Sequence, residues 1–513
     1  MSSDCCRCRQ FLAQMLPAEI DMGDQELPDW LACHAGEYGL PPFLSELARL
    51  ETLVDTMAED EYDLTPPTKA RVVNPSLQMV QFPWRNLVAI LAGRDDVARP
   101  GEQLVLVWKQ SGGAVRYKNA EAQDLLALKL IDDSVDLAQA AQEHQVSLAY
   151  LDTMLERAAQ EEMILVPVTT IRRDATIFKE SELTPASYLS SNAFTLQWHI
   201  TQACDLHCKH CYDRSSRRAV AFDQALAVLE DFRSFCQQHH VYGQVTFTGG
   251  NPLLYPRFAE LYRAAAEHGF QLAILGNPVE KAVLEELQDI QPLEFYQVSL
   301  EGLASHNDHI RGAGHFQRVV DFLALLKGLG IYSMVMLTLT RENQDQVLPL
   351  ADFLRDKVDL FNFNRLAMVG EGARLLSAPS QGYEEFLRSY DEASAHNPCM
   401  GLKDNHLNTL FVRQGREVFG GCTGYGCGAA FNFLSLLADG EVHACRKFPS
   451  YIGNISDSSL TEIYHAEAAR RYRAGSRACD GCSIRAVCGG CLAVTHGMGL
   501  NIFADKDPYC FFD

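Results

Sequence analysis

Long apolar runs are missing from this sequence, and so is any excess of basic residues. No window of about 18 uninterrupted apolar residues occurs, so no transmembrane helix is expected. The opening residues, MSSDCCRCRQ, lack the apolar core of a signal peptide. Because 66 acidic residues outweigh 44 basic ones, the net charge of −22 disfavours nucleic acid and anionic membranes as partners. These absences predict a cytoplasmic protein.

Low-complexity segments are also missing. Hydrophobic residues make up 47% of the chain and charged residues 21%, a composition that favours folding over disorder. A chain of 513 residues exceeds one ordinary domain, so we expect roughly two to four.

Cysteine, by contrast, is abundant. A reducing cytosol seldom maintains structural disulfides, so 17 cysteines in such a chain favour metal ligation. Eight of them lie between Cys422 and Cys510, and three lie between Cys204 and Cys211. Three others near the N-terminus are interpreted as incidental thiols rather than a metal site: Cys5, Cys6 and Cys8.

The first 170 residues carry no obvious catalytic motif. Residues 1–95 are predicted to form short amphipathic helices broken by prolines, as in FLSELARLETLVDTMA. Residues 96–170 open with two alternating strands, QLVLVWK and AVRYK, and continue with three helical stretches, an order typical of a winged-helix domain. The last helix is acidic on its polar face, which favours a peptide or protein ligand over DNA.

Strands and helices then alternate through residues 190–400. Six strand–helix repeats indicate parallel strands covered by helices, and therefore a barrel or part of one. In such barrels the chemistry lies at the C-terminal strand ends. The expected strands are 194–201, 244–250, 271–277, 295–302, 331–339 and 360–366.

The segment CDLHCKHC directly follows the first of these strands. Three thiolates from one loop, Cys204, Cys208 and Cys211, can hold three irons of a cubane cluster and leave the fourth iron open to a chelating ligand. A zinc site with His207 or His210 as fourth ligand is the alternative.

This CxxxCxxC motif, placed after the first strand of a six-repeat barrel, resembles that of the radical S-adenosylmethionine (SAM) superfamily. The resemblance implies that the amino and carboxylate groups of SAM chelate the open iron, and that electron transfer yields a 5′-deoxyadenosyl radical. It also implies cofactor contacts from TGGN, VSLEG and the motif itself: His210, Gly249, Gly250, Asn251, Ser299 and Glu301. The family usually has Glu where this chain has Asn251, whose amide oxygen accepts a hydrogen bond without the full charge.

The eight C-terminal cysteines make two sets of four. Their spacing alone also fits a pair of zinc ribbons, because the 479/482 and 488/491 couples have zinc-knuckle spacing. The array resembles the SPASM extension of radical SAM enzymes, although two residues separate Cys488 from Cys491 where three are usual. The resemblance implies two auxiliary [4Fe-4S] clusters, and therefore three clusters in all. It assigns the first to Cys422, Cys427, Cys445 and Cys491, and the second to Cys479, Cys482, Cys488 and Cys510.

Residues 35–165, with GLPPFLSELARLE and NPSLQMVQFPW, resemble HvfC/BufC-type partner proteins of peptide-modifying systems. Their winged-helix half also resembles the element by which peptide maturases bind a leader sequence as an added strand. A packing domain without a ligand is the alternative. The combination of this N-terminal module with the six-repeat barrel and the C-terminal cysteines resembles the thio(seleno)oxazole-modification (SbtM-like) maturases.

The predicted fold is α/β: a partial (β/α)6 TIM-like radical SAM barrel with N-terminal helical and winged-helix domains and a C-terminal SPASM extension. The expected domains are 1–95, 96–170, 190–400 and 401–513. The predicted function is oxidative modification of a ribosomally synthesised precursor peptide, giving a thioether, a carbon–carbon link or a heterocycle. A flavodoxin or ferredoxin would supply electrons, and the peptide would bind through the N-terminal region.

Two alternatives remain. A sulfatase-maturase type would carry an acid directly after Cys445, where this chain has Arg446. A non-catalytic iron-sulfur scaffold for electron transfer would not need the cofactor motifs.

Overall fold

The computed structural model describes residues 12, 26–67, 70–95, 97–135, 137, 140–141, 146 and 148–512. Cys5, Cys6 and Cys8 therefore lie outside the described residues. The chain forms two compact units, Met1–Val168 and Thr169–Asp513. None of the described helices is both long and apolar enough to cross a membrane.

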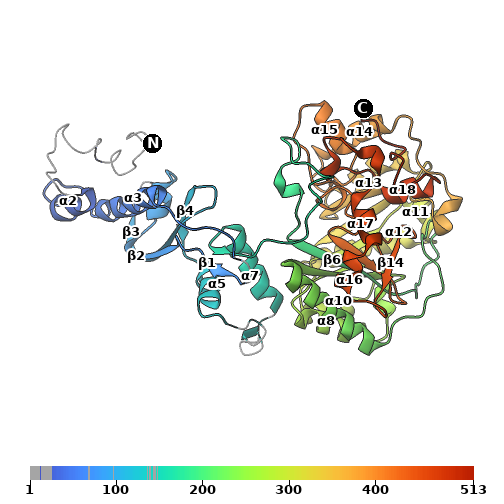
Figure 1. The fold of residues 1–513 in the computed structure, drawn as a ribbon, viewed down its shortest axis with the longest axis horizontal. Coiled ribbons are helices and arrows are strands. Elements are labelled where there is room, and N and C mark those ends of the chain that lie inside the picture. The colour runs from blue at the N-terminus through green and yellow to red at the C-terminus, as the bar shows by residue number, and fades with distance from the viewer. Residues whose placement is uncertain are drawn as a thin grey trace. The chain divides into compact units, whose positions relative to one another are not determined.

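The N-terminal unit is built on a three-stranded antiparallel sheet in the order β2-β3-β4, with a separate pair formed by β1 and β5 (Figure 1). Its described elements are α2 (Leu27–His34), α3 (Leu44–Glu59), β1 (Val72–Val73), β2 (Gln78–Arg85), α4 (Leu87–Leu91), β3 (Arg99–Lys109), β4 (Val115–Asn119), α5 (Ala122–Asp132), α7 (Leu148–Gln160) and β5 (Ile164–Leu165).

Strand β3 separates two small cores. Val105 and Val107 pack into a core shared with α2 and α3, whereas Leu106 and Trp108 face a second core formed with α5 and α7. Both faces of β3 are buried at residues 105–108, which explains why the run Val105, Leu106, Val107 and Trp108 is continuously apolar.

Strand β2 corrects one expectation, because it lies in the stretch predicted to be helical. Its alternating residues Val80, Phe82 and Trp84 pack on the first core, and this period of two belongs to a strand rather than a helix.

The C-terminal unit confirms the predicted α/β fold with six parallel strands in chain order. They are β6 (Ala193–Thr201), β7 (Tyr242–Gly249), β8 (Gln271–Leu275), β9 (Phe295–Ser299), β10 (Ser333–Leu339) and β11 (Leu360–Arg365). Three later strands extend the same sheet beyond β6: β12 (Phe433–Leu436), β13 (Glu441–His443) and β14 (Tyr451–Asn454). Because β12 pairs in parallel with β6, the C-terminal region continues the barrel sheet (Figure 1).

A large hydrophobic core runs through this unit, and a small one lies around Ile484 and Val487. The large core joins barrel residues such as Trp198 and Phe247 to Leu436 and Val442 of the C-terminal strands. The helices of the unit are α8 (Phe222–His239), α9 (Phe258–Glu267), α10 (Lys281–Ile290), α11 (Ala304–Arg311), α12 (His315–Gly328), α13 (Val347–Leu354), α14 (Tyr383–Ser394), α15 (Leu407–Arg413), α16 (Leu460–His465), α17 (Glu467–Ala474) and α18 (Leu492–Gly497).

Candidate active site and iron-sulfur centres

The loop that follows β6 carries three cysteines, which we call the loop triad: Cys204, Cys208 and Cys211. All three line one cavity of about 400 Å³, together with residues at the carboxyl ends of β7 to β11. Contacts elsewhere in the unit fix the loop backbone: Arg214 donates to the carbonyl of Cys208 (2.8 Å) and the Glu371 amide donates to that of Cys211 (2.8 Å). The loop is therefore held through its carbonyls, while its thiols border the cavity.

The donor set fits an iron-sulfur cluster. No three His, Cys, Asp or Glu side chains in the described part of the chain converge on a position for a single metal ion. A cubane is larger than an ion and takes one thiolate per iron, so thiols spread around a cavity suit it.

Gly249 and Gly250 line the same cavity, and both need to be glycine. A Cβ on Gly249 would collide with the carbonyl of Thr201, and one on Gly250 with that of Ala203. The absent side chains therefore allow the end of β7 to pack against the backbone that leads into the loop triad.

His210, Glu301 and Arg311 form a buried cluster beside the loop triad. Glu301 Oε1 lies 3.2 Å from His210 Nε2 and 2.6 Å from Arg311 Nη2, and its Oε2 accepts a hydrogen bond from the Thr338 amide. Burial alone would raise the pKa of Glu301, but His210 and Arg311 hold it well below its usual range. Arg311 also reaches Cys208 Sγ (3.6 Å).

Of the predicted cofactor residues, four line the cavity: His210, Gly249, Gly250 and Ser299. Glu301 is 2% exposed and engaged with Arg311, so it lies behind the cavity wall. Asn251 is also buried, and it donates to Asp205 of the triad loop (3.1 Å).

The C-terminal cysteines gather around two further cavities. One, of about 290 Å³, is lined by what we call the first C-terminal group: Cys422, Cys427, Cys445 and Cys491. The other, of about 440 Å³, is lined by the second C-terminal group: Cys479, Cys482, Cys488 and Cys510. These are the sets that the SPASM resemblance implies, and four thiols around one cavity fit a cluster without an open iron.

Buried polar side chains fix the backbone of both groups. Asn405 Oδ1 accepts from the amide of Cys422 (2.7 Å), and its Nδ2 donates to the carbonyl of Cys488 (2.7 Å). Asp507 accepts from the amide of Cys491 (2.8 Å) and pairs with Arg365 at the end of β11. Each of these contacts ties a ligand-bearing loop to another part of the unit.

The triad cavity and the cavity of the first C-terminal group share their wall inside the barrel. Both are lined by Leu275, Gln297, Met336, Asn364, Arg365, Arg446 and Lys447. Burial lowers the pKa of Lys447, and the thiols of Cys422, Cys491 and Cys445 partly offset that effect. Arg446 and Lys447 therefore bring positive charge to the space between two cysteine groups.

Sequence reasoning assigned no role to several of these residues. Arg311 lay within the segment HNDHIRG, and Asp205 within the cysteine motif itself. Their proximity to the thiols depends on the fold and cannot be seen in the sequence. Only Arg446 and Lys447 could have been found from the sequence, because they directly follow Cys445.

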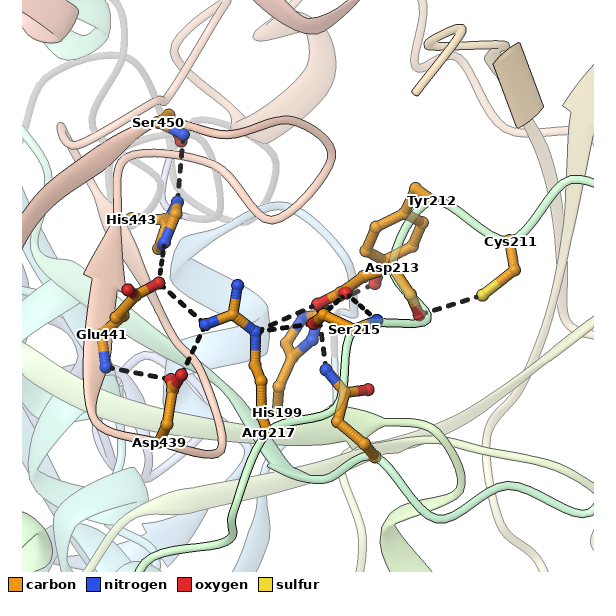
Figure 2. Close-up of polar contacts among 11 residues, drawn as sticks. His199, Cys211, Tyr212, Asp213, Ser215, Arg217, Asp439, Glu441, His443 and Ser450 are labelled. Carbon is orange, nitrogen blue, oxygen red and sulfur yellow. Dashed lines mark hydrogen bonds and ion pairs between the residues drawn. The ribbon is translucent and has the colours of Figure 1, made fainter. Parts of the chain in front are cut away.

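An ion-pair network links the triad loop to the β12–β13 turn (Figure 2). Arg217 lies 2.6 Å from Asp439, 2.8 Å from Glu441 and 3.6 Å from Asp213. Glu441 contacts His443, which accepts from the Ser450 amide. The Ser450 hydroxyl accepts from the amide of Cys445 (3.0 Å). Figure 2 shows these groups in sequence between the Cys211 end of the loop and Ser450.

Comparisons with known proteins agree with this geometry. Residues 198–354 match the model of the radical SAM superfamily, and residues 427–491 match that of an iron-sulfur cluster-binding domain, SPASM. The mycofactocin maturase MftC of Mycolicibacterium smegmatis is 28% identical over 61% of this chain and 82% of its own length. An AdoMet-dependent heme synthase of Methanosarcina barkeri is 22% identical over 62% of this chain and 96% of its own length.

Among solved structures, Streptococcus suis SuiB bound to its precursor peptide SuiA has the same fold, with a TM-score of 0.51 at 16% identity. The match covers 86% of this chain and 99% of that one.

The chain thus combines a radical SAM domain with a C-terminal SPASM domain. These two domains imply SAM and [4Fe-4S] clusters as its cofactors, and the thiol cavities fit such clusters.

Proposed function

We propose that this chain is a radical SAM maturase that modifies a ribosomally synthesised precursor peptide. When bound, SAM and its cluster supply a 5′-deoxyadenosyl radical that removes hydrogen from a core residue. The shared wall between the triad cavity and the cavity of the first C-terminal group carries the proposal. A substrate in the barrel interior lies between a radical source and an electron acceptor, an arrangement suited to oxidation.

The proposal includes three [4Fe-4S] clusters, one at each cysteine group. Clusters held by the two C-terminal groups would supply acceptors for the electron that an oxidised substrate gives up, and a donor of flavodoxin or ferredoxin type would reduce a cluster held by the loop triad. A reducing cytoplasm is the compartment that keeps so many thiols available as ligands. The oxidation gives a thioether, a carbon–carbon link or a heterocycle.

The N-terminal unit is proposed to capture the leader of the peptide. Strand β4 is an edge of the three-stranded sheet, and an edge strand offers backbone groups to which a peptide can add as a further strand. Its Lys118 is held by Asp124 (2.9 Å) and Glu161 (2.7 Å) of the same unit. MftC is named as a mycofactocin maturase, and SuiB is bound to its precursor peptide SuiA in the solved structure, which supports the proposal.

Hydrogen exchange tests the capture step. A candidate precursor peptide, sought among the short open reading frames beside the gene, is added to the full-length protein, and amide exchange is followed by mass spectrometry. Protection is expected at β4, with β2, the opposite edge of the sheet, as the internal control. Equal exchange at β4 with and without peptide would remove the capture role.

The chemistry is tested by incubating the reconstituted protein, without oxygen, with SAM, a strong reductant and the peptide. Formation of 5′-deoxyadenosine together with an oxidised peptide is expected. Absence of SAM cleavage would favour the electron-transfer scaffold, and a residue converted to an aldehyde would favour the sulfatase-maturase type. Because a heme synthase is among the relatives, a tetrapyrrole replaces the peptide in a parallel reaction. Turnover only with the tetrapyrrole contradicts the maturase.

A further inference from the structure

The walls of the triad cavity and of the cavity of the first C-terminal group carry more positive than negative side chains. Only two carboxylates line these cavities in the described part of the chain, Asp213 and Asp404. Six Lys and Arg side chains line one or both of them: Arg214, Arg311, Arg365, Lys403, Arg446 and Lys447. In a chain with a net charge of −22, the sign of the charge is thus reversed around the barrel interior.

Four of these cations are held by groups of the protein itself. Arg311 and Arg365 form ion pairs with buried carboxylates. Arg214 and Lys403 donate to backbone carbonyls of the cysteine loops. The two remaining cations directly follow Cys445 and line the wall that the two cavities share.

These two cations, Arg446 and Lys447, form no ion pair with an Asp or Glu of the residues that the structure describes. Lys447 lies among the thiols of the first C-terminal group, and thiolates that hold a cluster there would offset its charge. Arg446 instead acts on His199: burial, and then the charge of Arg446, lower the pKa of this imidazole to about 3, so it is neutral at pH 7. Arg446 is therefore a guanidinium at a cavity wall without an anionic partner.

Two amide side chains line the same shared wall. Gln297 belongs to β9 and Asn364 to β11, and both are half-buried. Neither side chain forms a hydrogen bond within the described residues, so their N–H groups are available to a ligand. A guanidinium presents paired donors that match the two oxygens of a carboxylate, and amides add further donors. The ligand group that suits this wall is a carboxylate.

We propose that Arg446, together with Gln297 and Asn364, binds a carboxylate of the substrate inside the barrel. The peptide then carries an Asp, a Glu or its C-terminus close to the residue that reacts. This assignment rests on the proposed function for the identity of the substrate as a peptide. A tetrapyrrole with acidic side chains would offer the same chemical group, and the experiment separates the two sources.

A pair of peptides that differ in one charge tests the assignment. The probes are acetyl-Gly-Glu-Gly-amide and acetyl-Gly-Gln-Gly-amide, which have nearly the same shape. Their dissociation constants are measured by ligand-observed nuclear magnetic resonance on the reconstituted full-length protein, with SAM present and without reductant. Arg446→Gln removes the charge and Arg446→Lys keeps it. Arg341→Gln, which removes an exposed arginine of the same unit, is the matched control.

The expected result is that the parent binds the glutamate peptide about tenfold more tightly than the glutamine peptide, as for one charge-assisted hydrogen bond. In R446Q the two dissociation constants should agree within about twofold. R446K should keep part of the preference, and R341Q should match the parent.

Equal affinity for the two peptides in the parent would overturn the assignment, and so would a preference that survives in R446Q or the binding of neither peptide. If R446Q holds less iron than the parent, the parent alone decides. Phenylglyoxal modification of Arg446, located by mass spectrometry, should then be slowed by the glutamate peptide and not by the glutamine peptide. Equal modification with both would overturn the assignment.

Two further outcomes separate this assignment from the identity of the substrate. Mesoporphyrin, a tetrapyrrole with carboxylate side chains, is tested in the same way. If it binds in an Arg446-dependent manner while the glutamate peptide does not bind, the peptide is the wrong source of the carboxylate. A parent protein that shows the charge preference but neither cleaves SAM nor modifies a peptide refutes the proposed function and leaves the carboxylate site standing.

Discussion

The loop triad and the two C-terminal groups differ in the number of their thiols and in the exposure of one thiol on each side. The triad has three thiols, and Cys204 among them is exposed. The C-terminal groups have four thiols each, and Cys488 among them is buried. Burial raises the pKa of the Cys488 thiol, so its thiolate depends on the positive charge of a metal.

The side chains that contact the cysteine loops also differ between the triad and the C-terminal groups. At the triad, Arg311 and Asn277 contact sulfur and line the cavity, and the loop backbone is held through the carbonyls of Cys208 and Cys211. At the C-terminal groups, Asn405 and Asp507 hold backbone amides and carbonyls of the ligand loops. The contrast agrees with the proposal that a cluster at the triad keeps one iron open to a ligand, whereas four thiols would close each of the other two.

The largest effect is expected from removing the open site. Replacing Cys204, Cys208 and Cys211 with alanine should abolish formation of 5′-deoxyadenosine and lower iron from about twelve to about eight per chain, since only the closed clusters remain. Iron analysis and chromatography measure both. Cys33→Ala, which removes an exposed thiol of the N-terminal unit, is the control. Peptide turnover by the triple variant would refute the reading of the triad.

A smaller effect on SAM cleavage is expected when the second C-terminal group is changed. The double variant C479A/C482A should lose about four irons per chain yet still cleave SAM, because the second C-terminal group holds no open iron. The ratio of 5′-deoxyadenosine to modified peptide should rise, since the electron acceptor is lost. Mass spectrometry of the peptide gives this ratio. An unchanged ratio would show that the second group takes no part in oxidation.

The buried ion pair between Asp507 and Arg365, beside the C-terminal groups, is tested separately. Asp507→Asn leaves Arg365 buried with a reduced set of partners, and breaking such a pair costs about 3–5 kcal/mol. Urea unfolding of the iron-loaded protein should show this loss of stability. The control is Asp352→Asn, which breaks an exposed pair with Arg355 and should change little. Equal stability of D507N and the parent would mean that Asp404 alone compensates the buried charge of Arg365.

The sequence predicted the parts of this comparison that depend on local patterns. The alternation of strand-like and helical segments predicted the six parallel strands, and cysteine spacing predicted which thiols belong to a loop. It did not predict contacts between distant segments, such as Arg365 with Asp507 or Asp205 with Asn251. Those pairs are set by how strands and loops meet in three dimensions, and no periodicity encodes them.

Some predictions depended on a departure from a known pattern. The short spacing between Cys488 and Cys491 left their pairing undetermined in sequence, and the fold separates the two through the turn at Gly489 and Gly490, both with positive φ. The joining of β12 to β6 was not foreseen either, because β12 has only four residues and its partner is more than two hundred residues away.

The smallest expected effect lies at the link between the two kinds of site. Arg217 pairs with Asp439 and Glu441, and its side chain is 19% exposed to solvent. Because solvent weakens such ion pairs, Arg217→Gln should lower the free energy of unfolding by only about 1 kcal/mol or less. A double-mutant cycle with Glu441→Gln measures the part that belongs to their contact. Arg374→Gln, at an exposed pair with Glu371, is the control.

A positive coupling energy would mean that the triad loop and the Cys445 loop stabilise each other. A substitution that destabilises one loop should then broaden the electron paramagnetic resonance signal of the cluster at the other. Zero coupling would make the open and closed sites mechanically independent. Electron transfer between them would then depend on the barrel interior alone, where Arg446 and Lys447 lie.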